Sequence, residues 1–238
     1  MPRLGLGIGV DKLKTFNREG LPNWVTAYWD GAANNSGSGT DSFIWTDLIN
    51  GYEFSATSGT TPTVVNNTVY LGSHSNVVAA STGKIESLVA NSQRPTFSST
   101  YVLFFITDMI EWGTGNRWAS PSGYLNWRGT TGGNRKAMLA SGYTINREVT
   151  NLVYHIHVVN GTSHKLWCGP NNIKEAENQN DPSAYTTIQT IGFYFGGRYV
   201  GTNASSAAPF GLRAFGYAEY APTDNEVRQL VAYLNSLI

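Results

Sequence analysis

The dipeptide Asn160-Gly161 lies between segments 152–159 and 162–168, and apolar residues alternate with histidines over 154–158 of the first segment. Both central residues of a two-residue hairpin turn adopt positive φ, which Asn and Gly tolerate better than other residues. Alternation with a period of two is typical of β-strands. This part of the chain therefore predicts an antiparallel hairpin and favours a protein built from antiparallel sheets.

The composition agrees with a β fold. Charged residues make up 13% of the 238 residues, against about 25% in an average soluble domain. Gly, Ser, Thr and Asn take their place, as in chains with many strands joined by polar loops. Hydrophobic residues make up 41%, which is enough for a sizeable core. We expect one all-β sandwich, a class that often exceeds about 200 residues as a single domain.

Other short apolar segments are bounded by turn residues and predict further strands. They span 24–29, 52–57, 63–71, 84–90, 101–106, 188–199 and 210–220, with a strand or a single turn at 43–48. Segment 101–106, Tyr-Val-Leu-Phe-Phe-Ile, is apolar without alternation. It therefore predicts a central strand that is buried on both faces.

The C-terminal segment predicts a single helix. Thr223 and Glu226 have the three-residue spacing of a capping box. The apolar residues that follow recur at helical spacing. They are Val227, Leu230, Val231, Leu234 and Leu237. We expect this helix to pack one face against the domain.

Segment 111–136 looks like an insertion in which strands are short or absent, and it is rich in aromatic residues. Sugars present C–H faces that stack on aromatic rings and hydroxyls that bond to amides and guanidinium groups. The candidate carbohydrate-binding residues are Trp112, Arg117, Trp118, Tyr124, Asn126, Trp127 and Arg128. The alternative is that these tryptophans fill the edge of the sandwich or a subunit contact.

Residues 1–20 are predicted to be an attachment arm, ahead of a domain that spans 21–238. Glycines alternate with four apolar residues in this arm, as in a strand with one apolar face. These assembly residues are Leu4, Leu6, Ile8 and Val10. Gly-rich strands are weak alone, so the arm is expected to pair with its own domain, another copy or a larger particle. A disordered tail is the alternative.

Charge and hydropathy exclude several classes of function. Lys plus Arg and Asp plus Glu number 16 each, so the net charge is zero. Electrostatic binding to nucleic acid is therefore not expected, and no apolar segment approaches the roughly 20 residues of a membrane span. We expect no signal peptide. The single cysteine, Cys168, excludes an internal disulfide and a cysteine metal cluster. It is expected to be a small buried hydrophobe.

Several short motifs occur in an order that resembles laminin-G-like domains of the concanavalin A-type jelly rolls. The motifs are Trp29-Asp-Gly, Trp45-Thr-Asp-Leu, Asn50-Gly-Tyr, Leu166-Trp-Cys-Gly, Ile191-Gly192, Phe210-Gly211 and Thr223-Asp-Asn-Glu226. Cys168 departs from the Asn or Asp usual in that family. The resemblance implies a jelly-roll sandwich of two antiparallel sheets with a short C-terminal helix, as on bacteriophage virion and tail proteins.

The resemblance also raises glycan cleavage, because laminarinase-type enzymes share this sandwich. They are expected to carry carboxylates on one strand in the pattern Glu-x-Asp-x-x-Glu, which does not occur here. Asp108 and Glu111 come nearest, but a spacing of three puts them on opposite faces of a strand. The sequence therefore predicts a protein that is not an enzyme.

Two groups of residues are candidate metal ligands. Many laminin-G-like domains carry calcium, and the oxygens of Asp30, Asp41 and Asp47 could supply ligands here. The alternative is that Asp30 and Asp47 cap turns. His155 and His157 share one face of the predicted hairpin, and a two-residue turn at Asn160-Gly161 would pair His157 with His164. A solvated polar face is the favoured interpretation of these histidines.

The combined prediction is a non-enzymatic virion or surface-appendage protein that recognises carbohydrate. Its expected partners are other virion proteins, copies of itself and a bacterial surface glycan. Its expected location is the virion, or the outside of cells after lysis. A structural decoration protein without a glycan ligand and a glycan-degrading enzyme are the alternatives.

Overall fold

The computed structural model describes most of the sandwich. The described residues are 19–56, 61–71, 85–87, 100–109, 117–121, 125–129, 135–139, 152–161, 163–169, 176–178, 193–195, 198–200, 203–205 and 210–238. The predicted arm residues Leu4, Leu6, Ile8 and Val10 lie outside these ranges.

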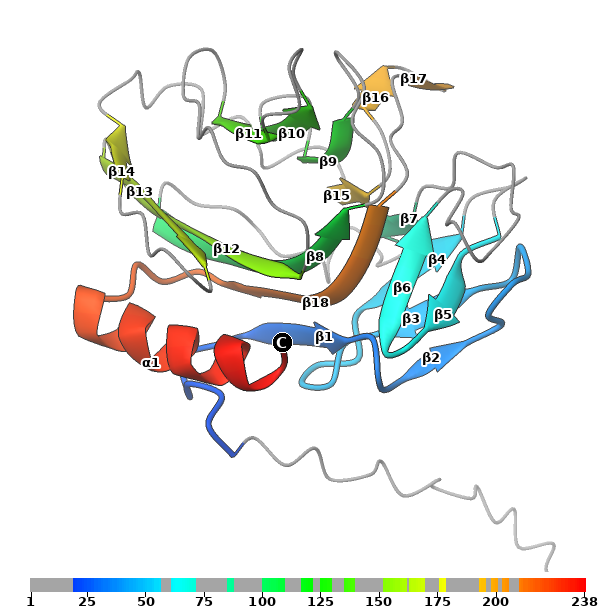
Figure 1. Cartoon of the computed structure of the whole chain (residues 1–238), viewed down its shortest axis with the longest axis horizontal. Helices are drawn as coiled ribbons and strands as arrows, with labels where there is room; N and C mark the ends of the chain where they lie inside the picture. The colour runs from blue at the N-terminus through cyan, green and yellow to red at the C-terminus, as the bar shows by residue number, and fades with distance from the viewer. Residues whose placement is uncertain are drawn as a thin grey trace, which may run out of the picture.

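The first sheet is antiparallel and has eight strands (Figure 1). Their bounds are β1 Ala27–Asp30, β5 Thr63–Val65, β6 Thr68–Leu71, β8 Thr100–Met109, β12 Val153–Asn160, β13 Ser163–Gly169, β14 Ala176–Asn178 and β18 Phe210–Ala218. The order is β14-β13-β12-β8-β18-β6-β5, and β1 also pairs with β18. The long strands β8, β12 and β18 therefore form the middle of this sheet.

The second sheet also has eight antiparallel strands. Their bounds are β2 Asn35–Ser36, β3 Ile44–Thr46, β4 Glu53–Ala56, β7 Ile85–Ser87, β9 Arg117–Pro121, β10 Leu125–Gly129, β11 Arg135–Leu139 and β15 Phe193–Phe195. The order is β11-β10-β9-β15-β7-β4-β3-β2. A separate two-stranded sheet joins β16, Arg198–Val200, to β17, Asn203–Ser205.

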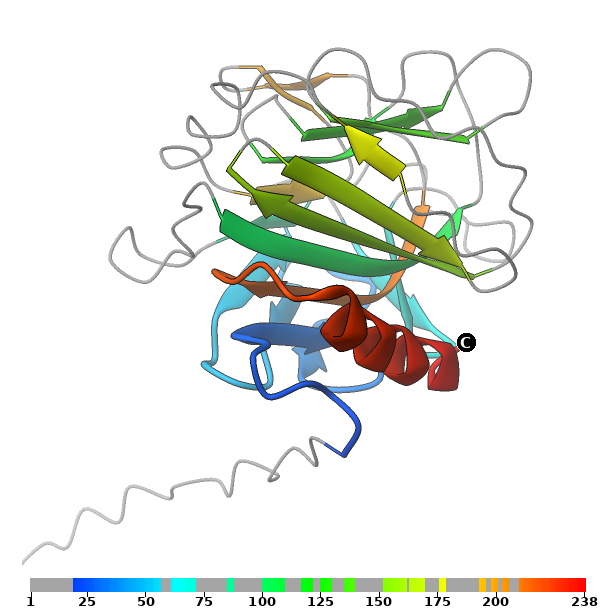
Figure 2. The same cartoon turned by 90° about the vertical axis from the view of Figure 1, so that its left-hand side faces the viewer.

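The helix α1, Asp224–Ser236, lies along the side of the first sheet that faces away from β9, β10 and β11 (Figures 1 and 2). The domain therefore has three layers, with the first sheet in the middle. The predicted all-β sandwich of two antiparallel sheets with a C-terminal helix is confirmed.

The middle position of the first sheet explains the apolar run in β8. Every residue from Tyr101 to Ile106 is buried. Val102, Phe104 and Ile106 belong to the core cluster that α1 covers, and Phe105 stacks on Phe215 of β18 at 5.2 Å between ring centroids. Because alternate residues face different layers, both faces must be apolar. The predicted central strand is confirmed.

The helix begins as its sequence predicts. The Thr223 hydroxyl accepts a hydrogen bond from the Glu226 N–H, and the Glu226 carboxylate accepts one from the Thr223 N–H. Each bond satisfies a backbone N–H group that has no partner within the helix. The buried face of the helix consists of Val227, Leu230, Val231 and Leu234.

Aromatic rings connect the two sheets on the other side. Trp29 of β1 stacks on Phe215 with 5.1 Å between ring centroids, and Phe215 stacks on Phe105. Phe54 of β4, in the second sheet, lies 4.8 Å from the Trp29 ring and 5.8 Å from the Phe215 ring. Strand pairing places Trp29 opposite Phe215 and Phe215 opposite Phe105. A ladder of cross-strand neighbours thus forms the core between the sheets.

The hairpin of β12 and β13 differs from its predicted register. The structure pairs Asn160 with Ser163, Val159 with His164, and His157 with Leu166. The predicted pairing of His157 with His164 is wrong, because the turn begins one residue later than expected. Gly161, at φ +57°, is the glycine that the turn requires.

Two segments contain more regular structure than predicted. The expected strand 63–71 is a hairpin of β5 and β6, whose turn residues Asn66 and Asn67 have φ of 48° and 61°. Segment 111–136, predicted to be an insertion, contributes β9, β10 and the start of β11 to the second sheet. Short strands next to a large sheet give a weak periodic signal, because each one has few residues.

Candidate functional site

Five of the seven residues predicted to bind carbohydrate lie on two paired strands of the second sheet. Arg117 and Trp118 belong to β9, and Asn126, Trp127 and Arg128 belong to β10. Trp112 and Tyr124 lie outside the described residues. The strands bring together five positions that are up to eleven residues apart in the sequence.

The pairing of these strands is irregular at one tryptophan. Trp127 pairs with Ala119 and Arg128 pairs with Arg117, so the register passes over Trp118. Such a bulge bends a strand and is common where a sheet carries a site. The strand β9 also pairs with β15 on its other side, which makes it an internal strand of the sheet.

Asp47, a predicted calcium ligand, is buried and bonded to the backbone. Its Oδ1 accepts hydrogen bonds from the N–H groups of Tyr28 at 2.6 Å and Ile49 at 3.1 Å. Its Oδ2 accepts from the N–H of Asn50 at 2.6 Å. Burial raises the pKa of the Asp47 carboxyl, against these N–H groups, which lower it. This arrangement is a structural anchor between β1 and the turn that follows β3.

Asp30 and two tryptophans complete this connection. The Trp29 indole N–H donates to the Trp45 carbonyl at 3.2 Å, and the Trp45 indole N–H donates to the Asp30 carbonyl at 2.8 Å. The Asp30 carboxylate accepts from the Ala32 N–H at 2.8 Å. The motifs Trp29-Asp and Trp45-Thr-Asp thus link a strand of one sheet to a strand of the other.

The calcium hypothesis gains nothing from this geometry. Asp41 is exposed, whereas Asp47 is buried and bonded to N–H groups. Among the residues that the structure describes, no group of three or more His, Cys, Asp or Glu side chains could hold a metal ion. The hydrogen bonds of Asp30 and Asp47 to nearby backbone N–H groups agree with the alternative that these residues cap turns.

The histidines do not form a solvated face. His155 and His157 are 7% and 1% exposed, and the His157 ring meets the Phe105 ring edge-on at 6.3 Å. The predicted polar face is wrong because β12 lies inside the middle layer, where both faces of a strand are covered. Alternation of His with Tyr, Ile and Val distinguishes two faces but does not show that either reaches solvent.

Asp108, one of the two carboxylates nearest to a glycosidase pattern, accepts a hydrogen bond from the Tyr70 hydroxyl at 2.7 Å. Burial and this carboxylate raise the pKa of Tyr70 beyond its usual range. The phenol therefore stays protonated and serves as a donor to Asp108. Glu111 lies outside the described residues.

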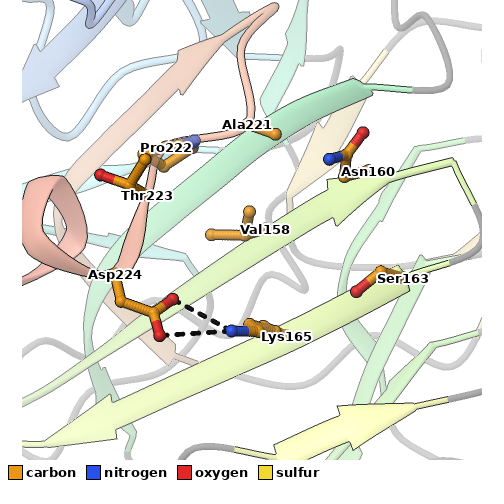
Figure 3. Close-up of a pocket in the computed structure, with 8 residues that line it drawn as sticks. All are labelled: Val158, Asn160, Ser163, Lys165, Ala221, Pro222, Thr223 and Asp224. Atoms are coloured by element: carbon orange, nitrogen blue, oxygen red, sulfur yellow. Dashed lines mark hydrogen bonds and ion pairs between the residues drawn. The ribbon is translucent and has the colours of Figure 1, made fainter.

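A groove that the sequence did not reveal lies between the β12–β13 hairpin and the start of α1 (Figure 3). Its volume is about 250 Å³. It is lined by Val158, Asn160, Ser163, Lys165, Ala221, Pro222, Thr223 and Asp224. Its two sides come from segments about sixty residues apart in the sequence, 158–165 and 221–224, so the groove exists only in the folded structure. The Lys165 ammonium lies 3.0 Å from the Asp224 carboxylate.

The fold resembles several solved structures at low sequence identity. A mutant Trypanosoma rangeli sialidase displaying trans-sialidase activity matches with a TM-score of 0.65 and 12% identity over 90% of this chain. Domain 4 of a GH43 extracellular arabinanase from Geobacillus stearothermophilus, in complex with arabinotriose, matches with a TM-score of 0.55 and 14% identity. This second match covers 87% of this chain and 98% of that domain.

A third similar structure concerns botulinum neurotoxin type C, which depends upon interaction with two ganglioside molecules to enter cells. Its TM-score is 0.53 at 13% identity, over 82% of this chain and 49% of that one. No family model and no curated protein sequence matches this chain. These structural neighbours bind or act on carbohydrates, and they share the β-sandwich fold. The laminin-G-like branch of that fold stays a prediction.

The prediction that the protein is not an enzyme needs correction. The sialidase structures are of enzymes, and they share this fold over 90% of the present chain. The β-sandwich fold therefore gives no reason to exclude glycan cleavage for this chain. The chain spans about a third of the length of those sialidases, 33% in the mutant.

Among the residues that the structure describes, no helix has the length and apolar character needed to span a membrane.

Proposed function

We propose that this chain is a carbohydrate-recognition domain. The observation that carries the proposal is the match to a complete arabinanase domain in complex with arabinotriose, which extends over 98% of that domain. The match also covers 87% of this chain, at 14% sequence identity.

The proposed binding surface includes the aromatic residues of β9 and β10. Trp118 and Trp127 supply rings for the C–H faces of a sugar, and Asn126 supplies an amide for its hydroxyls. The pairing of β9 with β10 supports this location, because it holds the candidate residues on neighbouring strands of a sheet. Rigid support lowers the entropy lost on binding.

The test is binding of the full chain to a broad panel that includes bacterial surface polysaccharides, arabinan oligosaccharides and sialylated oligosaccharides. Isothermal titration of the panel members that bind gives the affinity. Trp118→Ala and Trp127→Ala should each weaken binding by roughly tenfold, because each removes a stacking surface. Trp24→Ala is the matched control, since Trp24 precedes β1 and packs near α1.

The outcomes separate recognition from structure. Weaker binding with an unchanged melting temperature supports the proposal. Loss of stability without loss of affinity would show that the tryptophans fill the sandwich. If the wild-type chain binds no member of the panel, the carbohydrate-recognition proposal fails and an assembly role without a glycan ligand takes its place.

Glycan cleavage is a second candidate, favoured by the sialidase structures. Release of sialic acid or of new reducing ends from the same panel would establish it. The full chain must be assayed at high protein concentration, with heat-denatured protein as the control. Binding without any released product would favour recognition alone.

A virion or surface-appendage setting is part of the proposal, and the alternating arm is the feature that supports it. Deletion of residues 2–18 should leave glycan affinity unchanged but abolish attachment of the chain to the virion or appendage that carries it. Co-sedimentation of the full and shortened chains with particles from the source organism tests this. Equal co-sedimentation of both chains would contradict it.

A further inference from the structure

Contacts between β13 and α1 hold the two walls of the groove in place. Lys165 of β13 binds Asp224 through distances of 3.0 and 3.3 Å to its two carboxylate oxygens. Two residues further along β13, the Trp167 ring lies 5.5 Å from the guanidinium carbon of Arg228. Two residues of strand span about 6.7 Å and four residues of helix span about 6 Å. Because these spacings are similar, two successive contacts can form between β13 and α1.

The groove lies next to the Lys165–Asp224 ion pair, at the N-terminal end of α1. Residues 221–223 form the connection that precedes α1. Figure 3 shows Val158 between this connection and Lys165. Val158 is 6% exposed and belongs to the core cluster under α1. The capping box fixes Thr223 at the opposite wall. The floor of the groove at Val158 therefore rests on the packed core, so ligand binding would not have to order this floor first.

The lining combines an apolar floor with several kinds of hydrogen-bonding group. Val158 and Pro222 offer apolar contact, and Asn160 and Ser163 offer an amide and a hydroxyl. The Thr223 hydroxyl is already bonded to Glu226 in the capping box. Among the described residues that line the groove, Lys165 and Asp224 carry charge, and they neutralise each other. An uncharged ligand with many hydroxyls matches this set, whereas a charged ligand would find no net opposite charge.

We propose that this groove is a second saccharide-binding site, which takes one unit of a neutral sugar. The inference rests on the proposed function and adds a location on the helix side of the first sheet, away from β9 and β10 (Figure 1). A volume of about 250 Å³ is below the range of roughly 300–1,000 Å³ for drug-sized ligands. It therefore suits a single sugar ring.

The test uses the full chain with three neutral probes, arabinotriose, maltotriose and cellotriose, and one acidic probe, sialyllactose. Amide NMR shifts map where each probe binds, and titration gives the dissociation constant. At least one neutral probe should shift the backbone amides of groove residues that carry an N–H, namely Val158, Asn160, Ser163, Lys165, Ala221, Thr223 and Asp224. Its affinity should not change with salt concentration, because no charge pairing is involved.

Two substitutions and a matched control give the groove its own test. Asn160→Ala and Ser163→Ala should each weaken neutral-sugar binding at the groove by roughly three- to tenfold, since each deletes a hydrogen-bonding group. Asn235→Ala is the control, because Asn235 is also exposed but lies at the other end of α1. It should leave both affinity and groove shifts unchanged.

Each other result overturns the inference in a distinguishable way. If neutral probes bind but only Trp118→Ala and Trp127→Ala weaken them, the groove is not a site and the proposed function stands. If only sialyllactose shifts the groove amides, the choice of a neutral sugar is wrong. If no probe binds and the broad panel is also negative, the inference fails together with the proposed function.

Discussion

At the residue scale, the buried Asp47 carboxylate accepts a hydrogen bond from β1 that a neighbouring strand would otherwise accept. One edge of β1 pairs with β18. At the other edge the Tyr28 N–H donates to Asp47, and the Tyr28 carbonyl accepts from the Leu48 N–H at 2.8 Å. An unpaired buried N–H costs free energy comparable to a lost hydrogen bond, and Asp47 satisfies the Tyr28 N–H at this edge.

Replacing Asp47 should therefore destabilise the domain. Asp47→Ala leaves the N–H groups of Tyr28, Ile49 and Asn50 without this acceptor. We expect the free energy of unfolding to fall by about 2–4 kcal/mol, measured by urea denaturation. Asp41→Ala, at an exposed position, is the control and should change it by less than about 0.5 kcal/mol. Equal effects of the two would contradict the anchoring role.

The same carboxyl should make stability depend on pH. Burial raises the pKa of Asp47 in the folded protein, so the folded state holds the proton up to a higher pH than the unfolded chain. The contribution of this group is fully present below its unfolded pKa, about 3.9, and is lost as pH rises through the folded pKa.

Asp47→Asn removes the titrating group and gives the measurement. The unfolding free energy of the wild type minus that of Asp47→Asn should fall as pH rises from below the unfolded pKa of about 3.9 to neutral pH. Asp30, whose pKa burial also raises, is present in both proteins and cancels. A difference that is constant or rises with pH would show that the assigned direction is wrong.

At the scale of elements, Gly216 permits the close packing of β18 on β8. Gly216 pairs with Phe104, and a Cβ atom at Gly216 would overlap the Phe104 ring. Phe104 is fully buried and also stacks on Tyr28 at 6.2 Å. The ring therefore lies across the bare backbone of the neighbouring strand.

Gly216→Ala should cost about 1–3 kcal/mol through overpacking, as measured by thermal or urea unfolding. Phe104→Leu makes room for the added methyl group, so the double variant should lose less stability than the sum of the two single variants. Additive losses would mean that the methyl group meets some other obstacle.

At the scale of the whole molecule, the aromatic ladder holds the two sheets together. Phe215 contacts Trp29 and Phe105 in its own sheet and Phe54 in the other. Phe215→Ala should lower the free energy of unfolding by about 3–5 kcal/mol. Near-ultraviolet and far-ultraviolet circular dichroism should still change in one transition, since the sheets share this core. Separate transitions would show that the sheets unfold independently.

The predicted strands and helix agree well with the structure where local pattern decides. The apolar run 101–106 is the buried centre of β8, and the Thr223–Glu226 spacing is the capping box of α1. The errors concern burial and partners. Alternation predicts that His155 and His157 share one face but does not show that this face reaches solvent, and both side chains are buried.

The candidate site was predictable only in part. Aromatic content indicated residues 112–128, but the pairing of Arg128 with Arg117 across a bulge depends on the strand partners. The groove gave no signal, because Asn160 and Asp224 are ordinary polar residues far apart in the sequence. Its polar groups meet only when α1 packs beside β13.

The sequence by itself determined much of the local structure of this protein: the β12–β13 hairpin, the buried central strand and the capped helix. These features depend on φ preferences, period and short-range hydrogen bonds, which neighbouring residues decide. The tertiary structure alone decided that the first sheet is covered on both sides, that Asp47 completes the edge of β1, and that a groove lies beside α1. These features depend on contacts between distant residues, whose pairing becomes defined only when the layers pack.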